Sequence, residues 1–101
     1  MVITILQARV APEMVGALEQ EYSRRIGNLE AGIVQTFLLC DARDPALWQI
    51  ATVWRSREAL DEMRRLGETP TGVLIFRKAG AEPTLSVLDV VAHAAATQET
   101  P

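Results

Sequence analysis

Hydrophobic residues follow two different spacings along this chain. Segments rich in β-branched and aromatic residues predict strands, because such side chains suit a pleated, half-buried backbone. These segments are residues 2–10, 33–40, 47–54 and 84–93. After the first of them, apolar residues recur at steps of three and four, which indicates one buried helix face. Those apolar residues are Val15, Leu18, Tyr22, Ile26 and Leu29. Glu21 and Arg25 are expected to pair on the exposed side of this helix.

A second helix follows directly after the third predicted strand. Ser56 is a good N-cap, because its hydroxyl can accept a hydrogen bond from the first helical turn. The predicted buried face consists of Ala59, Leu60, Met63 and Leu66. Thr69-Pro70 then predicts the start of a short third helix that ends near Gly80. Val73–Phe76 also suits a strand, so this alternative stays open.

The order of elements, β-α-β-β-α-(α)-β, predicts a ferredoxin-like α+β domain with a four-stranded antiparallel sheet. Right-handed crossovers place the first strand beside the third, with both long helices on one face. The first and last strands are apolar on both faces, however, and helices can cover only one. Because a bare apolar sheet face is a large exposed patch, we expect two copies to pack face to face as a homodimer. The predicted domain covers residues 1–93, and residues 94–101 are predicted to form a flexible tail.

Composition and charge limit the classes of function. The chain has 101 residues, is 49% hydrophobic and 23% charged, and has a net charge of −3, as expected for one ordinary globular domain. Its nine arginines and one lysine form no basic stripe, which disfavours nucleic acid as a partner. No apolar run approaches the ~18 residues needed to cross a bilayer. The N-terminus lacks the features of a signal peptide, so we expect a cytoplasmic protein with no membrane contact.

A metal site and a reactive thiol are both disfavoured. Cys40 is the only cysteine, so no internal disulfide is possible. We expect it to be a buried structural thiol, because Asp41 beside it opposes a thiolate. His93 and Asp89 share one face of the last predicted strand, but an extended chain separates them by about 13 Å. Zinc needs three or four ligands close to the ion, so no metal is expected.

The segment Thr52–Leu60, TVWRSREAL, contains a strand that ends in Trp, then any residue, then Ser, then an apolar helix. With Ala31-Gly32-Ile33 before the second strand and with this order of elements, the chain resembles the antibiotic biosynthesis monooxygenase family over residues 2 to about 92. The resemblance implies a dimeric α+β barrel. It also implies a substrate cavity between the open face of the sheet and the helices, one in each protomer.

Members of this family differ in activity. Some oxidise anthrones or quinols with molecular oxygen and no cofactor, others degrade haem, one branch processes an autoinducer sugar phosphate, and many have no known activity. The resemblance therefore implies a cofactor-independent monooxygenase that acts on a small aromatic substrate, such as a quinol, an anthrone or a polyketide-like ring. The alternatives are a non-catalytic homodimer of the same fold that binds a small hydrophobic molecule, and a barrel packed solid.

Haem degradation is disfavoured by the residues that the haem-degrading branch requires. That branch has an Asn on the first strand, whereas the only Asn here, Asn28, follows the first helix. It also has a Trp and a His on or after the second helix. Both tryptophans of this chain lie in the third predicted strand, and Met63 stands roughly where that branch has its helical Trp.

Three residues are candidates for catalysis or for an aromatic wall. His93 is the side chain that titrates near neutrality unaided, which makes it the candidate general base, although a surface histidine is the alternative. Trp54 is a candidate wall for a flat aromatic substrate, or else a core anchor. Trp48 is a candidate lining residue of a cavity or of a dimer interface.

Polar residues interrupt the apolar strands, and small-molecule sites combine an apolar lining with a few polar groups. The interrupting residues are Thr4, Gln7, Arg9, Gln35, Thr36, Gln49, Thr52 and Ser86. We take Gln35, Thr52 and Arg9 as candidate substrate-binding residues. The alternative is that Gln7, Arg9 and Gln49 simply face solvent at the strand ends.

Overall fold

The computed structural model describes residues 1–96, which form four strands, three α-helices and one short 3-10 helix. In chain order these are β1 (Val2–Arg9), η1 (Pro12–Met14), α1 (Val15–Arg25), β2 (Ile33–Cys40), β3 (Leu47–Trp54), α2 (Arg57–Arg65), α3 (Thr71–Lys78) and β4 (Thr84–Asp89). The third helix is confirmed, and Val73–Phe76 is therefore not a strand. Its N-cap is Pro70 rather than the predicted Thr69.

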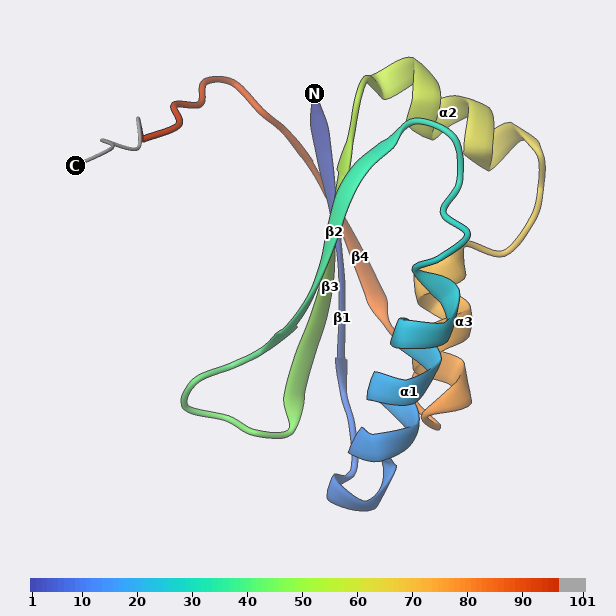
Figure 1. The fold of residues 1–101 in the computed structure, drawn as a ribbon, viewed down its shortest axis with the longest axis vertical. Helices are drawn as coiled ribbons and strands as arrows, with labels where there is room; N and C mark the ends of the chain where they lie inside the picture. Colours follow the sequence, from blue (N-terminus) through green and yellow to red (C-terminus); the bar gives the residue numbers. More distant parts are fainter. Residues whose placement is uncertain (97–101) are drawn as a thin grey trace.

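The strands form one antiparallel sheet in the order β2-β3-β1-β4. Figure 1 shows all three α-helices on one side of this sheet, with α1 against α3 and α2 at the other end. The opposite side of the sheet carries no helix in the described part of the chain. This arrangement confirms the predicted ferredoxin-like α+β fold.

The junction between β3 and α2 has the local structure that its sequence predicts. Ser56 Oγ accepts a hydrogen bond from the Ala59 backbone N–H at 3.1 Å, an N-cap contact that contributes about 1 kcal/mol. Leu60 is buried against Trp54, as expected. Leu66 was predicted to be buried, which is wrong: it is 66% exposed, because it caps α2 beyond the last helical turn.

The loop before β2 is held tightly against α2. Gly32 has a φ of +93°, and a Cβ at this position would lie 2.5 Å from the Cβ of Ala59. The Arg55 backbone N–H also donates to the Gly32 carbonyl at 2.8 Å. Only glycine tolerates both this conformation and this close approach. The loop that carries Glu30 is therefore fixed to the end of β3.

β4 is shorter than the sequence predicts and ends at Asp89. Its partner β1 starts at Val2, which pairs with Asp89, so further residues have no strand to pair with. One additional bond joins the Val90 N–H to the Met1 carbonyl at 3.1 Å. His93 was placed in this strand, which is wrong: it lies exposed in irregular chain. Of the predicted tail, residues 97–101 lie outside the described residues.

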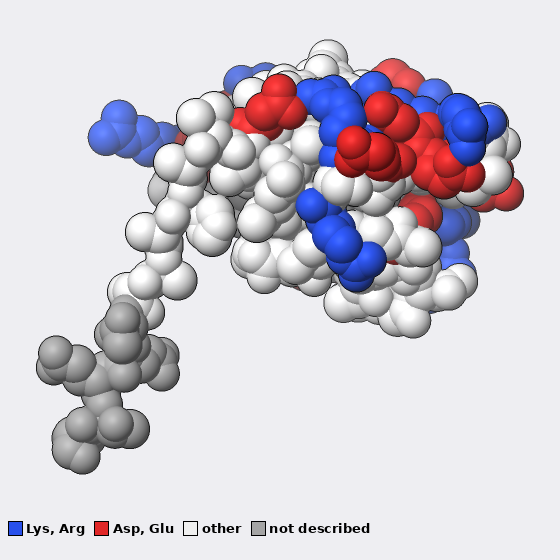
Figure 2. Space-filling model, turned by 90° about the horizontal axis from the view of Figure 1, so that it is seen from above, with Lys and Arg blue, Asp and Glu red and all other residues white. Residues whose placement is uncertain are grey.

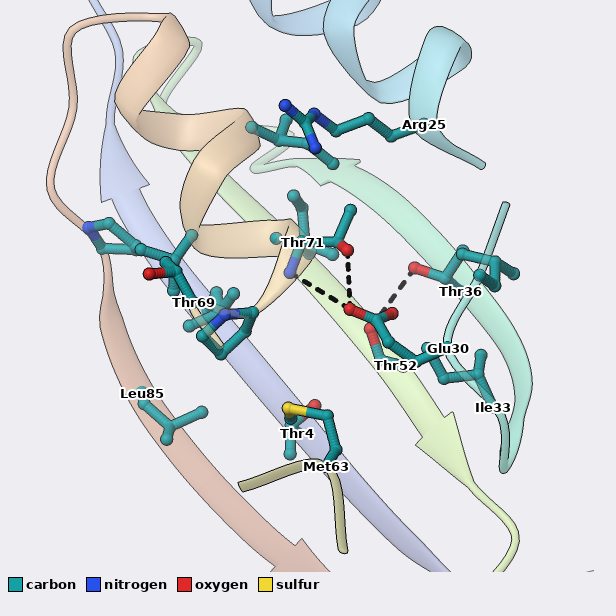
Figure 3. Close-up of a pocket in the computed structure, with 18 of the residues that line it drawn as sticks. Thr4, Arg25, Glu30, Ile33, Thr36, Thr52, Met63, Thr69, Thr71 and Leu85 are labelled. Carbon is teal, nitrogen blue, oxygen red and sulfur yellow. Dashed lines mark hydrogen bonds between the residues drawn. The ribbon is translucent and has the colours of Figure 1, made fainter. Parts of the chain in front are cut away.

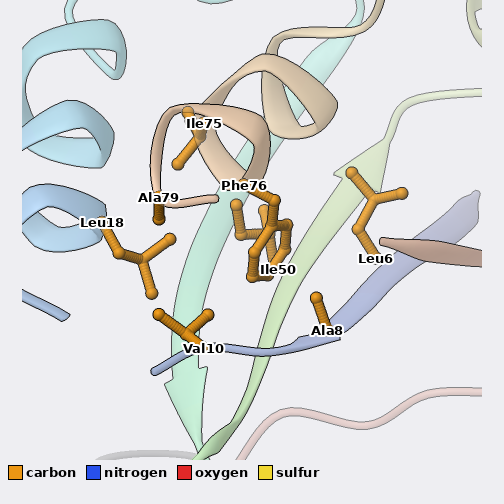
Figure 4. Packing of buried hydrophobic residues seen from close by; sticks show 8 residues of the cluster. All are labelled: Leu6, Ala8, Val10, Leu18, Ile50, Ile75, Phe76 and Ala79. Carbon is orange, nitrogen blue, oxygen red and sulfur yellow. The ribbon is translucent and has the colours of Figure 1, made fainter. Parts of the chain in front are cut away.

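The main hydrophobic core lies between the sheet and the pair α1 and α3 (Figure 4). Leu18 of α1 and Phe76 of α3 are completely buried there. They pack with Leu6, Ala8, Val10, Ile50, Ile75 and Ala79. A smaller cluster under α2 contains Val2, Trp54 and Leu60. The candidate site lies between these two clusters.

The uncovered face of the sheet carries an exposed apolar patch. Phe37, Leu39 and Leu88 on this face are 44%, 41% and 49% exposed. Phe37 pairs with Ala51, and Ala51 pairs with Ile5, so the apolar surface continues across three strands. The first and last strands thus contribute apolar residues to this face, as predicted.

The remaining surface bears mixed charges. On the face seen in Figure 2, acidic and basic side chains are interspersed and form no separate basic area. Cys40 is exposed rather than buried, because it ends the edge strand β2. No helix within residues 1–96 has the length and hydropathy needed to cross a membrane.

Candidate functional site

A cavity of about 410 Å³ lies between the helix-covered face of the sheet and the three helices. All four strands and all three α-helices contribute to its lining, together with the loops around Glu30 and Thr69 (Figure 3). The volume lies within the range that is typical of small-molecule sites.

Most of the cavity wall is apolar and aromatic. The lining includes Leu6, Tyr22, Ile50, Trp54, Leu60, Met63 and Ile75. Trp54 is only 4% exposed, and its indole Nε1–H donates to Thr4 Oγ1 at 3.0 Å. This bond fixes the orientation of the ring. Two aromatic side chains in an apolar wall suit a flat aromatic ligand.

Three threonines cross the floor of the cavity in one row. Thr4 of β1 pairs with Thr52 of β3, and Thr52 pairs with Thr36 of β2. All three side chains line the cavity. The hydroxyls of Thr36 and Thr52 lie 3.4 Å apart, while Thr4 accepts its bond from Trp54. Because two hydroxyls share one hydrogen bond, the Thr36–Thr52 pair keeps one proton to donate to a bound molecule.

Glu30, from the loop between α1 and β2, brings a carboxylate to the same floor. Its Oε1 accepts hydrogen bonds from Thr71 Oγ1 at 2.6 Å and from the Thr71 backbone N–H at 3.3 Å. Thr71 is the first residue of α3, where backbone N–H groups lack intrahelical partners and favour a negative charge. In Figure 3 the Glu30 carboxylate points toward the hydroxyls of Thr36 and Thr52.

Arg25, at the end of α1, lines the cavity and is held by Glu21. Glu21 accepts hydrogen bonds from Arg24 Nε at 2.8 Å and from Arg25 Nε at 3.2 Å. The Arg24 hydrogen bond lowers the pKa of Glu21, and Arg25 lowers it further. The pairing of Glu21 with Arg25 is confirmed, but its predicted exposure is wrong: Glu21 is 5% exposed. The two arginines keep this carboxylate ionised.

The other carboxylates of the lining are exposed. Glu82 receives two hydrogen bonds from Arg77, at 3.0 and 2.9 Å, and these lower the pKa of Glu82. Glu68 lies exposed in the loop before α3. Within the described lining, Glu30 is therefore the carboxylate most shielded from solvent.

Two of the predicted site residues, Trp54 and Thr52, line this cavity. Trp48 does not: it packs beside the main core, and its indole N–H donates to the Pro45 carbonyl at 3.1 Å. His93 also lies outside the lining, in exposed chain after β4.

Arg9 and Gln35 point away from the cavity because of strand alternation. Both lie on the uncovered face of the sheet, and Arg9 pairs there with Asp44 at 2.7 Å. The same alternation sorts the whole set of polar strand residues. The helix-covered face carries Thr4, Thr36 and Thr52, and the uncovered face carries Gln7, Arg9, Gln35, Gln49 and Ser86.

Glu30 was missed by sequence reasoning. It lies in a predicted connection, and its partner Thr71 is 41 residues away in the chain. No local spacing signals such a contact. Thr4 and Thr36 carried a signal, as polar interruptions of apolar strands, but only the register shows that they meet Thr52.

The donor set does not fit a haem or a metal ion. Haem enzymes that activate oxygen commonly hold the iron through His or Cys, and the lining within residues 1–96 contains neither. The same residues contain no group of three His, Cys, Asp or Glu side chains that is placed to hold a metal ion.

The fold and the cavity define a ferredoxin-like α+β protein with a cavity of small-molecule size between its sheet and its helices. The chain belongs to the antibiotic biosynthesis monooxygenase family, because the model of that family matches residues 1–68. No protein of curated function matches the sequence.

Solved structures support the same fold. A candidate antibiotic biosynthesis monooxygenase from Deinococcus radiodurans has a TM-score of 0.71 at 14% identity, covering 97% of this chain and 100% of that one. The haem-degrader MhuD from Mycobacterium tuberculosis, solved with two haems in its active site, has a TM-score of 0.68 at 21% identity. That comparison covers 94% of this chain and 100% of MhuD. At such identities the likeness shows the fold alone.

Proposed function

We propose that this protein is a homodimeric, cofactor-independent monooxygenase that oxidises a small aromatic substrate, of the quinol or anthrone type, with molecular oxygen. The observation that carries the proposal is the cavity itself, which is largely apolar, is of substrate size and has polar groups gathered on its floor. Membership of the antibiotic biosynthesis monooxygenase family supports this class of reaction.

The reaction balances without an external reductant. At an anthrone-like methylene, both C–H bonds break and a C=O bond forms. One oxygen atom of O₂ enters the ring carbonyl, and the other leaves as water with the two hydrogens. The substrate supplies all four electrons, so the protein needs only to bind the ring, accept a proton and exclude water.

The residues of the cavity suit these tasks. Trp54 and Tyr22 offer aromatic surfaces that orient a flat ring. The apolar wall keeps water from the deprotonated carbon. Glu30 is the shielded carboxylate of the floor and takes the proton in this proposal, a role that the sequence had suggested for His93.

The homodimer is part of the same proposal. The uncovered sheet face exposes Phe37, Leu39 and Leu88, a patch that favours association. Among the described strand residues on this face, Arg9 is the single charged residue. A second copy of this face fits it best, because the apolar patches of two such faces can pack together without complementary charges. A cytoplasmic location stays a prediction.

Oxygen uptake by purified, metal-stripped protein tests the reaction, with anthrones, naphthoquinols and catechols as substrates. We expect uptake above the uncatalysed rate for at least one ring. Glu30→Gln is expected to lower the rate by about a hundredfold or more, the low end for loss of a general base. Glu19→Gln, on the exposed side of α1, is the matched control and should leave the rate unchanged.

No uptake with any substrate would overturn the reaction. If the same compounds nevertheless raise the melting temperature by mass action, the protein is instead a non-catalytic small-molecule binder.

A further inference from the structure

We infer that Glu30 and the Thr36–Thr52 pair form a subsite for one phenolic hydroxyl of the substrate. In this subsite a threonine hydroxyl donates a hydrogen bond to the phenol oxygen, and Glu30 Oε2 accepts a hydrogen bond from the phenol O–H. The inference rests on the proposed function for one point only, namely that an aromatic ring occupies the cavity.

The donor side of the subsite is the threonine pair. Thr36 and Thr52 lie opposite each other on β2 and β3, with their hydroxyls 3.4 Å apart. One proton serves the bond between them, and the other is available to a ligand. Thr4 is the third member of the row, but its hydroxyl already fixes the Trp54 indole.

The acceptor side is the second oxygen of Glu30. Both hydrogen bonds from Thr71 reach Oε1, and within residues 1–96 no group donates to Oε2. The anchoring to Thr71 and the tight loop at Gly32 hold this carboxylate in place. Figure 3 draws it beside Thr36 and Thr52, and all three residues line the same cavity, so a ligand there can meet donor and acceptor together.

A phenolic hydroxyl matches this subsite because the same oxygen can accept one hydrogen bond and donate another. A methyl ether accepts but cannot donate, and would leave Oε2 desolvated without a partner, which costs binding free energy. An anionic group would face the Glu30 carboxylate directly. The chemistry at this position therefore selects a ring with a hydroxyl over the corresponding ether or hydrocarbon.

Calorimetric binding of naphthol, methoxynaphthalene and naphthalene tests the subsite without any oxidation. We expect the wild-type protein to bind naphthol about tenfold more tightly than methoxynaphthalene, the value of one charge-assisted hydrogen bond. Glu30→Gln keeps an oxygen for Thr71 but turns an N–H₂ toward the ligand, so the preference should vanish. The double variant Thr36→Val/Thr52→Val should weaken naphthol and methoxynaphthalene relative to naphthalene, by about threefold or more.

Thr84→Val, which removes a hydroxyl on the uncovered face, is the matched control and should change no ratio. Equal affinity for naphthol and its ether in the wild type, or a preference unchanged in Glu30→Gln, overturns the subsite. A subsite confirmed without any oxygen uptake would leave this inference standing and overturn the proposed reaction instead.

Discussion

The hydrogen bond between Trp54 and Thr4 holds the aromatic wall of the cavity in place. The indole N–H is buried, and Thr4 Oγ1 is the acceptor that it meets. Thr4→Val keeps the shape of the side chain but leaves this N–H without a partner. We expect a loss of about 1–3 kcal/mol in the free energy of unfolding. Urea denaturation measures it, and Thr84→Val, at an exposed site, should cost less than about 0.5 kcal/mol.

Single residues also show where sequence reasoning succeeds and where it stops. Trp54 was selected as an aromatic wall and Thr52 as a polar residue that interrupts a strand, and both line the cavity. Gln35 and Arg9 were selected for polarity alone and lie on the other face, because a shift of one position reverses the side of a strand. Glu30 depends on a contact across the fold, which no local pattern reports.

The close contact between the Gly32 loop and α2 predicts how substitution of Gly32 changes the stability of the fold. Gly32→Ala would place a methyl group against Ala59 and force a left-handed backbone on alanine. We expect it to lower the free energy of unfolding by at least about 1 kcal/mol. Gly16→Ala is the control: Gly16 lies in α1 with open space around it, and alanine there should stabilise by about 0.5–1 kcal/mol. A stabilised Gly32→Ala variant in thermal unfolding would contradict the fold around the site.

The end of α1 gives a pH prediction. Hydrogen bonding from Arg24 lowers the pKa of Glu21 below its ordinary value of 4.5. A carboxylate whose folded pKa is depressed stabilises the fold above its unfolded pKa, and that stabilisation is lost as the pH falls through the folded value. The difference in unfolding free energy between wild type and Glu21→Gln should therefore shrink as the pH falls below 4.5. Denaturation curves at several pH values measure it. A difference that stays constant would show that Glu21 is not held ionised by Arg24.

Features of helices and strands that depend on local sequence are predicted well. Features that depend on pairing with another strand are not. The bounds of β2 and β3 and the Ser56 cap follow from short-range patterns, and the structure confirms them. The end of β4 does not, because it is set by where β1 begins. An apolar pattern thus continues to residue 93 although pairing stops at Asp89.

The uncovered sheet face gives a prediction for the whole molecule. If two copies pack through this face, Phe37→Glu places two charges in the interface and should convert a dimer to a monomer. Leu66→Glu is the matched control, because Leu66 is also apolar and exposed but lies at the end of α2. Light scattering after size exclusion measures the mass. A wild-type protein that is monomeric at micromolar concentration would contradict the dimer.

The central claim is that the cavity between the sheet and the helices holds an aromatic ring. A crystal structure of the protein with bound naphthol tests this claim most directly. We predict density for the ring beside Trp54, with its hydroxyl between Glu30 and the Thr36–Thr52 pair. A ring bound on the uncovered sheet face, or a cavity closed by its own side chains at saturating naphthol, would contradict the claim.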